Sequence, residues 1–203
     1  MEYKESIEVS FKGQRNYVQG PDIFNKVTDI LAQKKIHFLS ISMTFNKMAR
    51  TNIDLYLSDQ KDSLNKEHNA YFEVIKDENV SLFGSIVENG DPITSRNEYP
   101  EEEIFSLAKI NKDSQTISLL ETVEYSNTEI IVSLNKRLLQ QLYPDKKGKW
   151  LFTRFEVSGD ITNSYKDMVL ILKKNMNFKL TKTEILLDGE SVGFIYFSMI
   201  NQN

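Results

Sequence analysis

The segment before residue 23 contains the residues with the clearest capacity for chemistry: Arg15, Tyr17, Gly20 and Asp22. They lie just before, and at the start of, a stretch with helical periodicity. A helix start presents unpaired backbone amides and the positive end of the helix dipole, which can polarise a carbonyl or stabilise an oxyanion. In this setting Asp22 could act as a catalytic base, while Arg15, Tyr17 and Gly20 could bind the substrate.

Each of these residues also has an ordinary structural role. Glycine permits a turn with positive φ, and aspartate at a helix start is usually a cap or a favourable charge for the dipole. Arg15 could form a surface ion pair, and Tyr17 could be a partly buried aromatic. The turn and the cap are the more common roles, so the four site assignments are hypotheses.

Other chemistries have little support in the sequence. The chain has no cysteine, which excludes disulfides, thiolate catalysis and cysteine-bound zinc. It has no glycine-rich phosphate loop, nucleophile elbow, paired histidine motif or calcium loop. We therefore expect no metal and no cofactor. Both histidines have ordinary interpretations: His37 as a strand-edge residue after the helix, and His68 as a solvated residue in a polar loop.

Composition and charge restrict the class of protein. The chain has 203 residues with 40% hydrophobic and 27% charged side chains, which is typical of a globular protein. The net charge of −4 argues against nucleic acid as the main partner, because such binders need a clustered basic surface. No segment approaches the ~20 apolar residues of a membrane span, and the N-terminus lacks an apolar signal region. We expect a cytoplasmic protein with no membrane contact. The sequence leaves open whether the chain forms homo-oligomers.

Apolar periodicity predicts the elements that would position the site. Residues 6–11 alternate as in a half-buried strand, and residues 21–34 place Phe24, Val27, Ile30 and Leu31 on one helical stripe. Four strand-like runs follow, at 38–45, 52–58, 69–76 and 80–88.

The second half repeats this order. It has a strand at 116–120, a helix at 129–143 with Leu134, Leu138 and Leu142 facing the core, and strands at 149–157, 166–174, 177–187 and 191–200. At a constant offset of about 110 residues, the strand, loop and helix start of the first half fall on those of the second. We therefore predict an internal duplication with repeats at 1–89 and 104–203, one shared strand order, and a turn-rich linker at 90–103.

A strand, a loop, one amphipathic helix and a run of antiparallel strands resembles the hotdog fold. The nearest local likeness is the run from Arg15 to Asp22, which resembles the substrate-facing loop of β-hydroxyacyl-ACP dehydratases and acyl-CoA thioesterases. The resemblance implies an α+β protein of two tandem hotdog-like units, each with a central helix packed on a curved antiparallel sheet. It also implies acyl-CoA or acyl carrier protein as the partner, in lipid metabolism.

The dehydratases pair a histidine with an acidic residue of the partner subunit. This chain departs from that pattern, because its two histidines, His37 and His68, are not expected near the first helix start. Two functions therefore stay open: an acyl-thioester-handling protein, or a non-catalytic binding or assembly protein on the same scaffold. We expect any site to lie at the first helix start, because the offset of about 110 residues replaces its polar residues in the second half. The residues at the corresponding positions are Tyr125, Asn127, Ile130 and Val132.

Overall fold

The computed structural model describes residues 2–64, 67–77, 80–99, 101–119, 121, 123–159, 161 and 165–200. The chain divides into two compact units, Met1–Tyr99 and Pro100–Asn203. The boundary falls inside the predicted linker. Among the described residues, no helix is long and apolar enough to cross a membrane.

Five strands of the first unit form an antiparallel sheet in the order β1-β4-β6-β5-β3. A short parallel pair, β2 with β7, lies apart from this sheet. The strands are β1 (Glu2–Ile7), β2 (Phe11–Lys12), β3 (Ser40–Phe45), β4 (Thr51–Ser58), β5 (Ala70–Asp77), β6 (Val80–Pro92) and β7 (Arg96–Asn97), with a 3-10 turn, η1 (Lys61–Ser63), between β4 and β5.

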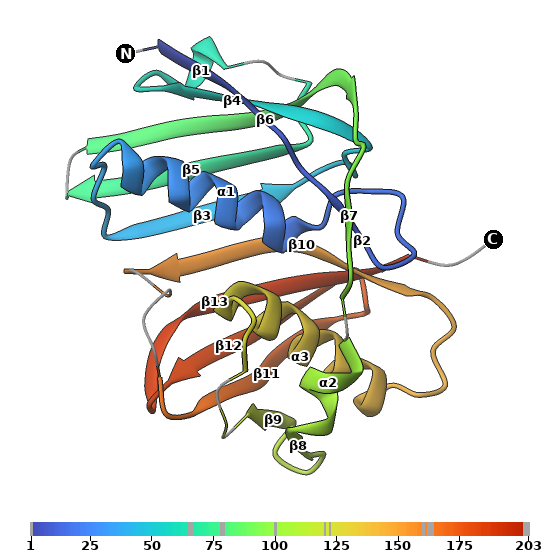
Figure 1. The fold of residues 1–203 in the computed structure, drawn as a ribbon. Coiled ribbons are helices and arrows are strands. Elements are labelled where there is room, and N and C mark those ends of the chain that lie inside the picture. The colour runs from blue at the N-terminus through green and yellow to red at the C-terminus, as the bar shows by residue number, and fades with distance from the viewer. Residues whose placement is uncertain are drawn as a thin grey trace. The chain divides into compact units, whose positions relative to one another are not determined.

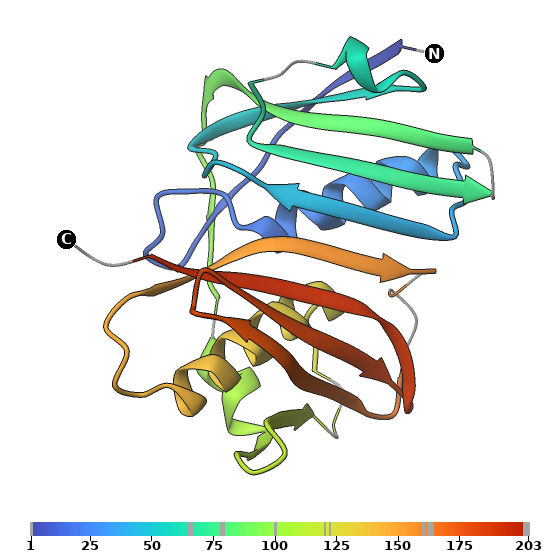
Figure 2. The same ribbon diagram turned by 180° about the vertical axis from the view of Figure 1, so that it is seen from behind.

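Helix α1 (Gly20–Gln33) covers one face of this sheet. Figure 1 shows α1 in front of β3, β5 and β6, and Figure 2 shows these strands in front of α1. The predicted stripe is confirmed, since Phe24, Val27, Ile30 and Leu31 are all buried. The apolar spacing that predicts the helix is therefore also what attaches it to the sheet.

Six strands of the second unit form an antiparallel sheet in the order β10-β13-β12-β11-β9-β8. Its helices are α2 (Glu101–Ser106) and α3 (Asn127–Leu142). The strands are β8 (Ala108–Asn111), β9 (Thr116–Leu119), β10 (Lys149–Ser158), β11 (Met168–Met176), β12 (Leu180–Leu187) and β13 (Glu190–Ile200).

The core of the second unit lies between α3 and its sheet. Leu134 and Leu138 are fully buried, as predicted, whereas Leu142 in the last turn is only half-buried. On β12 the buried side chains alternate along the strand and include Thr181, Thr183 and Ile185. This period of two places the three side chains on one face of the sheet.

The prediction that the two halves share one strand order is wrong. In the first unit β4 pairs with β6, whose other neighbour is β5. In the second unit the corresponding strand, β11, pairs directly with β12, and β13 follows. The last two strands have thus exchanged places between the units. Burial patterns in the sequence cannot reveal this difference, because both arrangements bury one face of each strand.

Two further expectations need correction at the ends of elements. The predicted strand at residues 6–11 is interrupted: Ile7 pairs with Ile53, but Val9 donates its amide to Asn52 Oδ1 at 3.0 Å, and Phe11 pairs with β7. The alternation of apolar and polar residues continues through this stretch, while the neighbouring strand changes from β4 to β7. The predicted linker at 90–103 also contains regular structure, namely the end of β6, all of β7 and the start of α2.

Candidate functional site

The start of α1 is the candidate site in the first unit. Gln19 is the N-cap residue with extended backbone angles, Gly20 is the first helical residue, and Pro21 follows it. Proline suits the first turn because its fixed φ matches the helix and its missing N–H would have no partner there. Asp22 adds a negative charge at the positive end of the dipole.

One buried side-chain donor at this helix start has no acceptor among the described residues. The amides of Asp22 and Ile23 donate to the Gln19 carbonyl at 3.1 and 3.2 Å. The Gly20 amide belongs to the first residue of the helix, so the helix itself offers it no acceptor. The side chain of Gln19 makes no capping bond, and its Nε2 atom is buried with no acceptor within the described ranges. Gln19 is only 8% exposed, so this is a costly place for an unsatisfied amide.

Asp22 forms an ion pair with a residue of β2. Lys12 Nζ lies 2.6 Å from Asp22 Oδ1, and the two side chains are 14% and 18% exposed. A neighbouring ammonium favours the ionised carboxylate, which is the form that a base requires. The same contact gives Asp22 a structural role, because it ties the first turn of α1 to β2.

Arg15 and Tyr17 lie in the loop between β2 and α1. The Arg15 guanidinium lies 5.4 Å from the centre of the Tyr99 ring, and Lys12 Nζ lies 5.5 Å from the same ring. Tyr17 is half-buried. The structure therefore brings Lys12 to Asp22 and Arg15 to Tyr99, while substrate binding by Arg15 and Tyr17 stays a prediction.

Sequence reasoning missed Gln19 and Lys12. The signal for Gln19 was the absence of Ser, Thr, Asp or Asn directly before a proline-initiated helix, since one of these usually caps such a start. Lys12 carried no local signal, because its role depends on a strand pairing distant in the sequence.

Neither histidine lies in the loop that leads into α1. His37 is exposed after the helix. The His68 ring lies 5.6 Å from the Tyr71 ring, in a tilted arrangement. In the described part of the chain, no group of three or more acidic, cysteine or histidine side chains could hold a metal ion.

The start of α3 differs from that of α1 in its cap, and the predicted residue correspondence is wrong. Gly20 and Asn127 are the first residues of their helices, so Asp22 corresponds to Glu129 and not to Val132. The two units differ in the length of chain before the helix, and a constant offset cannot follow such a change. Both helix starts therefore carry a carboxylate.

The α3 start has a capping box. Ser126 Oγ accepts a hydrogen bond from the Glu129 amide at 3.3 Å, and the Ser126 amide donates to Glu129 Oε2 at 3.2 Å. This capping box pairs the amides of the N-cap and the third helical residue with side-chain oxygens, and α1 has no such side-chain cap. The contrast between a capped and an uncapped helix start favours α1 as the binding position.

Solved structures show that the chain has the hotdog fold. The tesB protein of Mycobacterium avium subs paratuberculosis has a TM-score of 0.53 and 10% identity, over 98% of this chain and 93% of that one. The dehydratase domain of PpsC from Mycobacterium tuberculosis, in complex with C12:1-CoA, has a TM-score of 0.51 and 9% identity, with coverages of 98% and 93%.

A third similar structure is the pyran synthase domain from module nine of the sorangicin pathway. It has a TM-score of 0.50 and 7% identity, over 100% of this chain and 94% of that chain. No protein-family profile and no curated protein matches the sequence. At such identities the likeness establishes the fold, and the function must be argued from the site.

Proposed function

We propose that the chain is an acyl-thioester-handling protein of hotdog type that binds the acyl group of acyl-CoA or acyl carrier protein at the start of α1. The observation that carries the proposal is the buried Gln19 Nε2, which has no acceptor in the described part of the chain and belongs to the residue next to the first amide of the helix, that of Gly20. In this proposal the thioester carbonyl accepts hydrogen bonds from both donors. The helix dipole adds to the stabilisation of an oxyanion at that oxygen.

In the proposed reaction the thioester is hydrolysed. Asp22 takes a proton from a water molecule, the water oxygen attacks the carbonyl carbon, and the oxyanion accepts hydrogen bonds from Gly20 and Gln19. The carbon–sulfur bond then breaks, and the thiolate leaves with the proton that Asp22 held. Lys12 keeps Asp22 ionised before the attack. Arg15 and Tyr17 would contact the substrate from the preceding loop.

The proposal includes the tandem arrangement, with hotdog-like units at 1–89 and 104–203 joined by 90–103. Each unit supports it with one long helix against an antiparallel sheet, although the last two strands are exchanged. The first unit would carry the site, and the second would be structural.

Thermal-shift titration with acyl-CoAs of different chain length tests binding, because a ligand specific for the native state raises the melting temperature. Gln19→Leu keeps the volume but removes the donor, and Gly20→Ile places a branched side chain at the helix start. Both should abolish the shift. Gln33→Leu is the matched control at the exposed end of the same helix, and Asn127→Ala is the control at the α3 start. Equal losses in the variants and the controls would reject this site.

A non-catalytic binding protein is the second candidate, and the Lys12–Asp22 ion pair favours it. A carboxylate with an ammonium at 2.6 Å is a weaker proton acceptor than a free one. Release of free thiol from acyl-CoA distinguishes the candidates. Turnover that Asp22→Asn removes supports the enzyme, whereas binding without turnover supports the alternative.

A further inference from the structure

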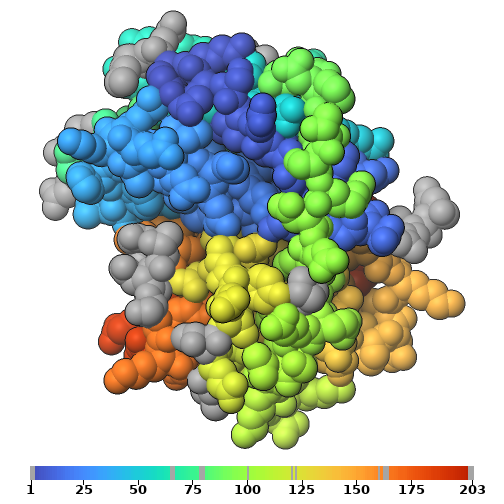
Figure 3. Space-filling model, in the orientation of Figure 1, coloured from blue at the N-terminus to red at the C-terminus, as the bar shows by residue number. Residues whose placement is uncertain are grey.

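The last residues of the first unit lie against the loop that leads into α1. These residues are Ser95 to Tyr99 and include β7. β7 pairs with β2 in parallel, so that Phe11 lies opposite Arg96. The Phe11 amide donates to the Ser95 carbonyl at 3.1 Å, and the Gly13 amide donates to the Asn97 carbonyl at 2.9 Å. Figure 3 shows this part of the chain, in green, on the surface beside the blue N-terminal residues.

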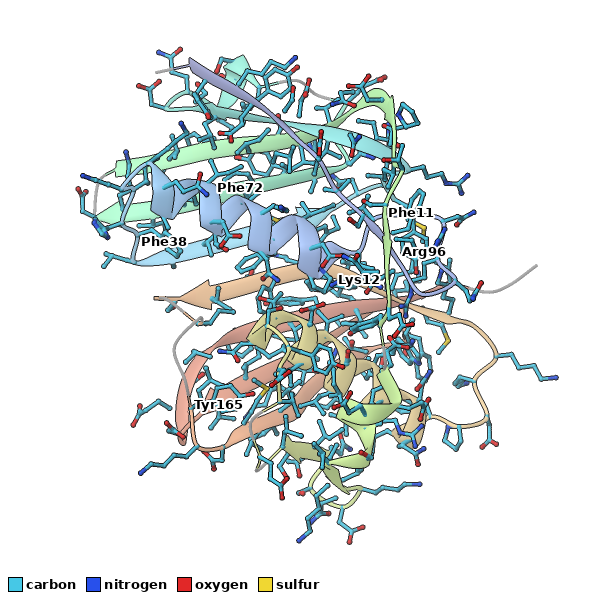
Figure 4. The ribbon with its side chains drawn as sticks, viewed as in Figure 1. Phe11, Lys12, Phe38, Phe72, Arg96 and Tyr165 are labelled. Atoms are coloured by element: carbon cyan, nitrogen blue, oxygen red, sulfur yellow. The ribbon has the colours of Figure 1, made fainter. Side chains whose placement is uncertain are left out.

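Arg96 makes two contacts with the loop after β2 and one with β2 itself. Its Nη1 atom donates to the carbonyl oxygens of Gly13 at 2.6 Å and Arg15 at 2.8 Å. Its guanidinium lies 5.1 Å from the centre of the Phe11 ring. Figure 4 places Phe11, Lys12 and Arg96 near one another at the end where α1 begins. One side chain thus fixes both the strand before the loop and the backbone within it.

Tyr99 provides a shared aromatic surface for two cations. Lys12 Nζ and the Arg15 guanidinium lie 5.5 and 5.4 Å from its ring centre. An aromatic face attracts cations through its quadrupole, and this attraction offsets part of the repulsion between the two positive groups. Lys12 is the same side chain that contacts Asp22.

We propose that Arg96 and Tyr99 are positioning residues of the α1 site, acting through Lys12 on Asp22. Arg96 fixes the backbone that carries Lys12 and Arg15, and Tyr99 fixes the direction of the Lys12 ammonium. The part of this inference that concerns acyl binding rests on the proposed function. The sequence gives no hint of the relationship, because residues 96 and 99 fall in the segment predicted to be a linker.

The variants separate an aromatic contact from mere bulk. Tyr99→Phe keeps the ring, Tyr99→Leu keeps an apolar side chain without a π face, and Arg96→Ala removes the contacts with Gly13, Arg15 and Phe11. Arg137→Ala is the matched control, because the Arg137 guanidinium lies 5.2 Å from the Phe105 ring in the second unit. Lys12→Met serves as the reference for a broken ion pair.

The first readout is the ¹³C resonance of the Asp22 carboxyl group in the full-length chain. Arg96→Ala and Tyr99→Leu should move it toward its position in Lys12→Met, while Tyr99→Phe and Arg137→Ala leave it unchanged. The second readout is acyl-CoA affinity. Loss of a cation–π contact of about 0.5–1 kcal/mol corresponds to about a two- to fivefold weakening.

An Asp22 resonance that stays in place in folded Arg96→Ala and Tyr99→Leu would overturn the positioning role. A moved resonance with unchanged acyl-CoA affinity would overturn its connection to acyl binding. If the wild-type chain binds no acyl-CoA or acyl carrier protein, the proposed function fails, yet the resonance still decides whether these residues position Asp22.

Discussion

Lys12 and Asp22 join a short strand to the first turn of a helix through an ion pair of 2.6 Å that is largely shielded from solvent. Lys12→Met should lower the free energy of unfolding by about 1.5–3 kcal/mol, because Asp22 loses a charged hydrogen-bond donor. Urea unfolding gives the value. Lys26→Met, at an exposed position of α1, is the control and should be nearly neutral. Similar small losses in both variants would mean that the pair adds nothing measurable to stability.

Thr181 and Thr183 make a matched pair on β12, since both are fully buried on the same face. Thr181 Oγ1 donates to the Phe197 carbonyl at 3.2 Å, whereas Thr183 Oγ1 has no partner within the described ranges. Thr181→Val should therefore cost about 0.5–1.5 kcal/mol, while Thr183→Val should be neutral or stabilising. Chemical denaturation of the two variants compares them directly. A larger loss for Thr183→Val would reveal a partner for its hydroxyl.

Asp54 on β4 is a buried carboxylate with several donors. Lys4 Nζ lies 2.7 Å from Oδ2, and Ser6 Oγ and Asn89 Nδ2 donate to Oδ1 at 2.8 and 3.3 Å. Burial works to raise the pKa of Asp54, but these hydrogen bonds outweigh it, and the pKa lies below the ordinary value of 3.8. The native state therefore favours the ionised form.

The lowered pKa of Asp54 makes part of the stability dependent on pH. This contribution is present above the unfolded value of 3.8 and is lost as the pH falls through the folded pKa. Asp54→Asn cannot titrate, so its free energy of unfolding should fall less steeply in acid than that of the wild type. Urea unfolding over the acid range measures both slopes, with the exposed Asp29→Asn as control. An unchanged slope in Asp54→Asn would contradict this assignment.

The two helix caps should respond differently to substitution. Ser126→Ala removes the side-chain acceptor of the α3 capping box and should cost about 0.5–2 kcal/mol. Gln19→Leu at the α1 start removes no capping bond and should leave stability unchanged or raise it. Thermal and urea unfolding of both variants test the contrast. A marked loss in Gln19→Leu would show that its amide is already satisfied and would remove the basis for the donor pair.

The packing of α3 can be tested with two leucines one turn apart. Leu138 is fully buried, whereas Leu142 is half-buried in the last turn. Leu138→Ala should cost about 2–5 kcal/mol, and Leu142→Ala clearly less. Urea midpoints at equal slopes provide the comparison. A loss below about 0.5 kcal/mol for Leu138→Ala would contradict the packing of this helix face.

Periodicity in the sequence predicted most of the elements and little of their pairing. The spacing of Phe24, Val27 and Leu31 reports burial along a helix, and burial is what the structure confirms. The same kind of signal continues from Ile7 through Val9, although the chain leaves its strand partner between them. Alternation records which side of the chain is buried, and it carries no information on which strand lies alongside.

The sequence predicted where the candidate site would lie, but it predicted only some of the residues there. Gly20 and Asp22 mark a helix start through local rules that act within a few residues. Lys12 and Tyr99 could not be found in this way, because the pairing of β2 with β7 joins parts of the chain that lie far apart in the sequence. Gln19 was visible in the sequence, but only the structure shows that its amide nitrogen is buried without an acceptor among the described residues.

The exchanged strands have a consequence for the order in which the two sheets assemble. In the second unit β11 pairs with β12 and β12 pairs with β13, so each of these two pairings closes only a short loop. In the first unit β4 pairs with β6, which comes after β5 in the chain. This pairing places Ser58 opposite Phe83 and Thr51 opposite Pro92. Contacts between distant residues form more slowly because more chain entropy is lost before they stabilise the fold. Pulsed hydrogen exchange during refolding should therefore find β11–β13 protected before β4.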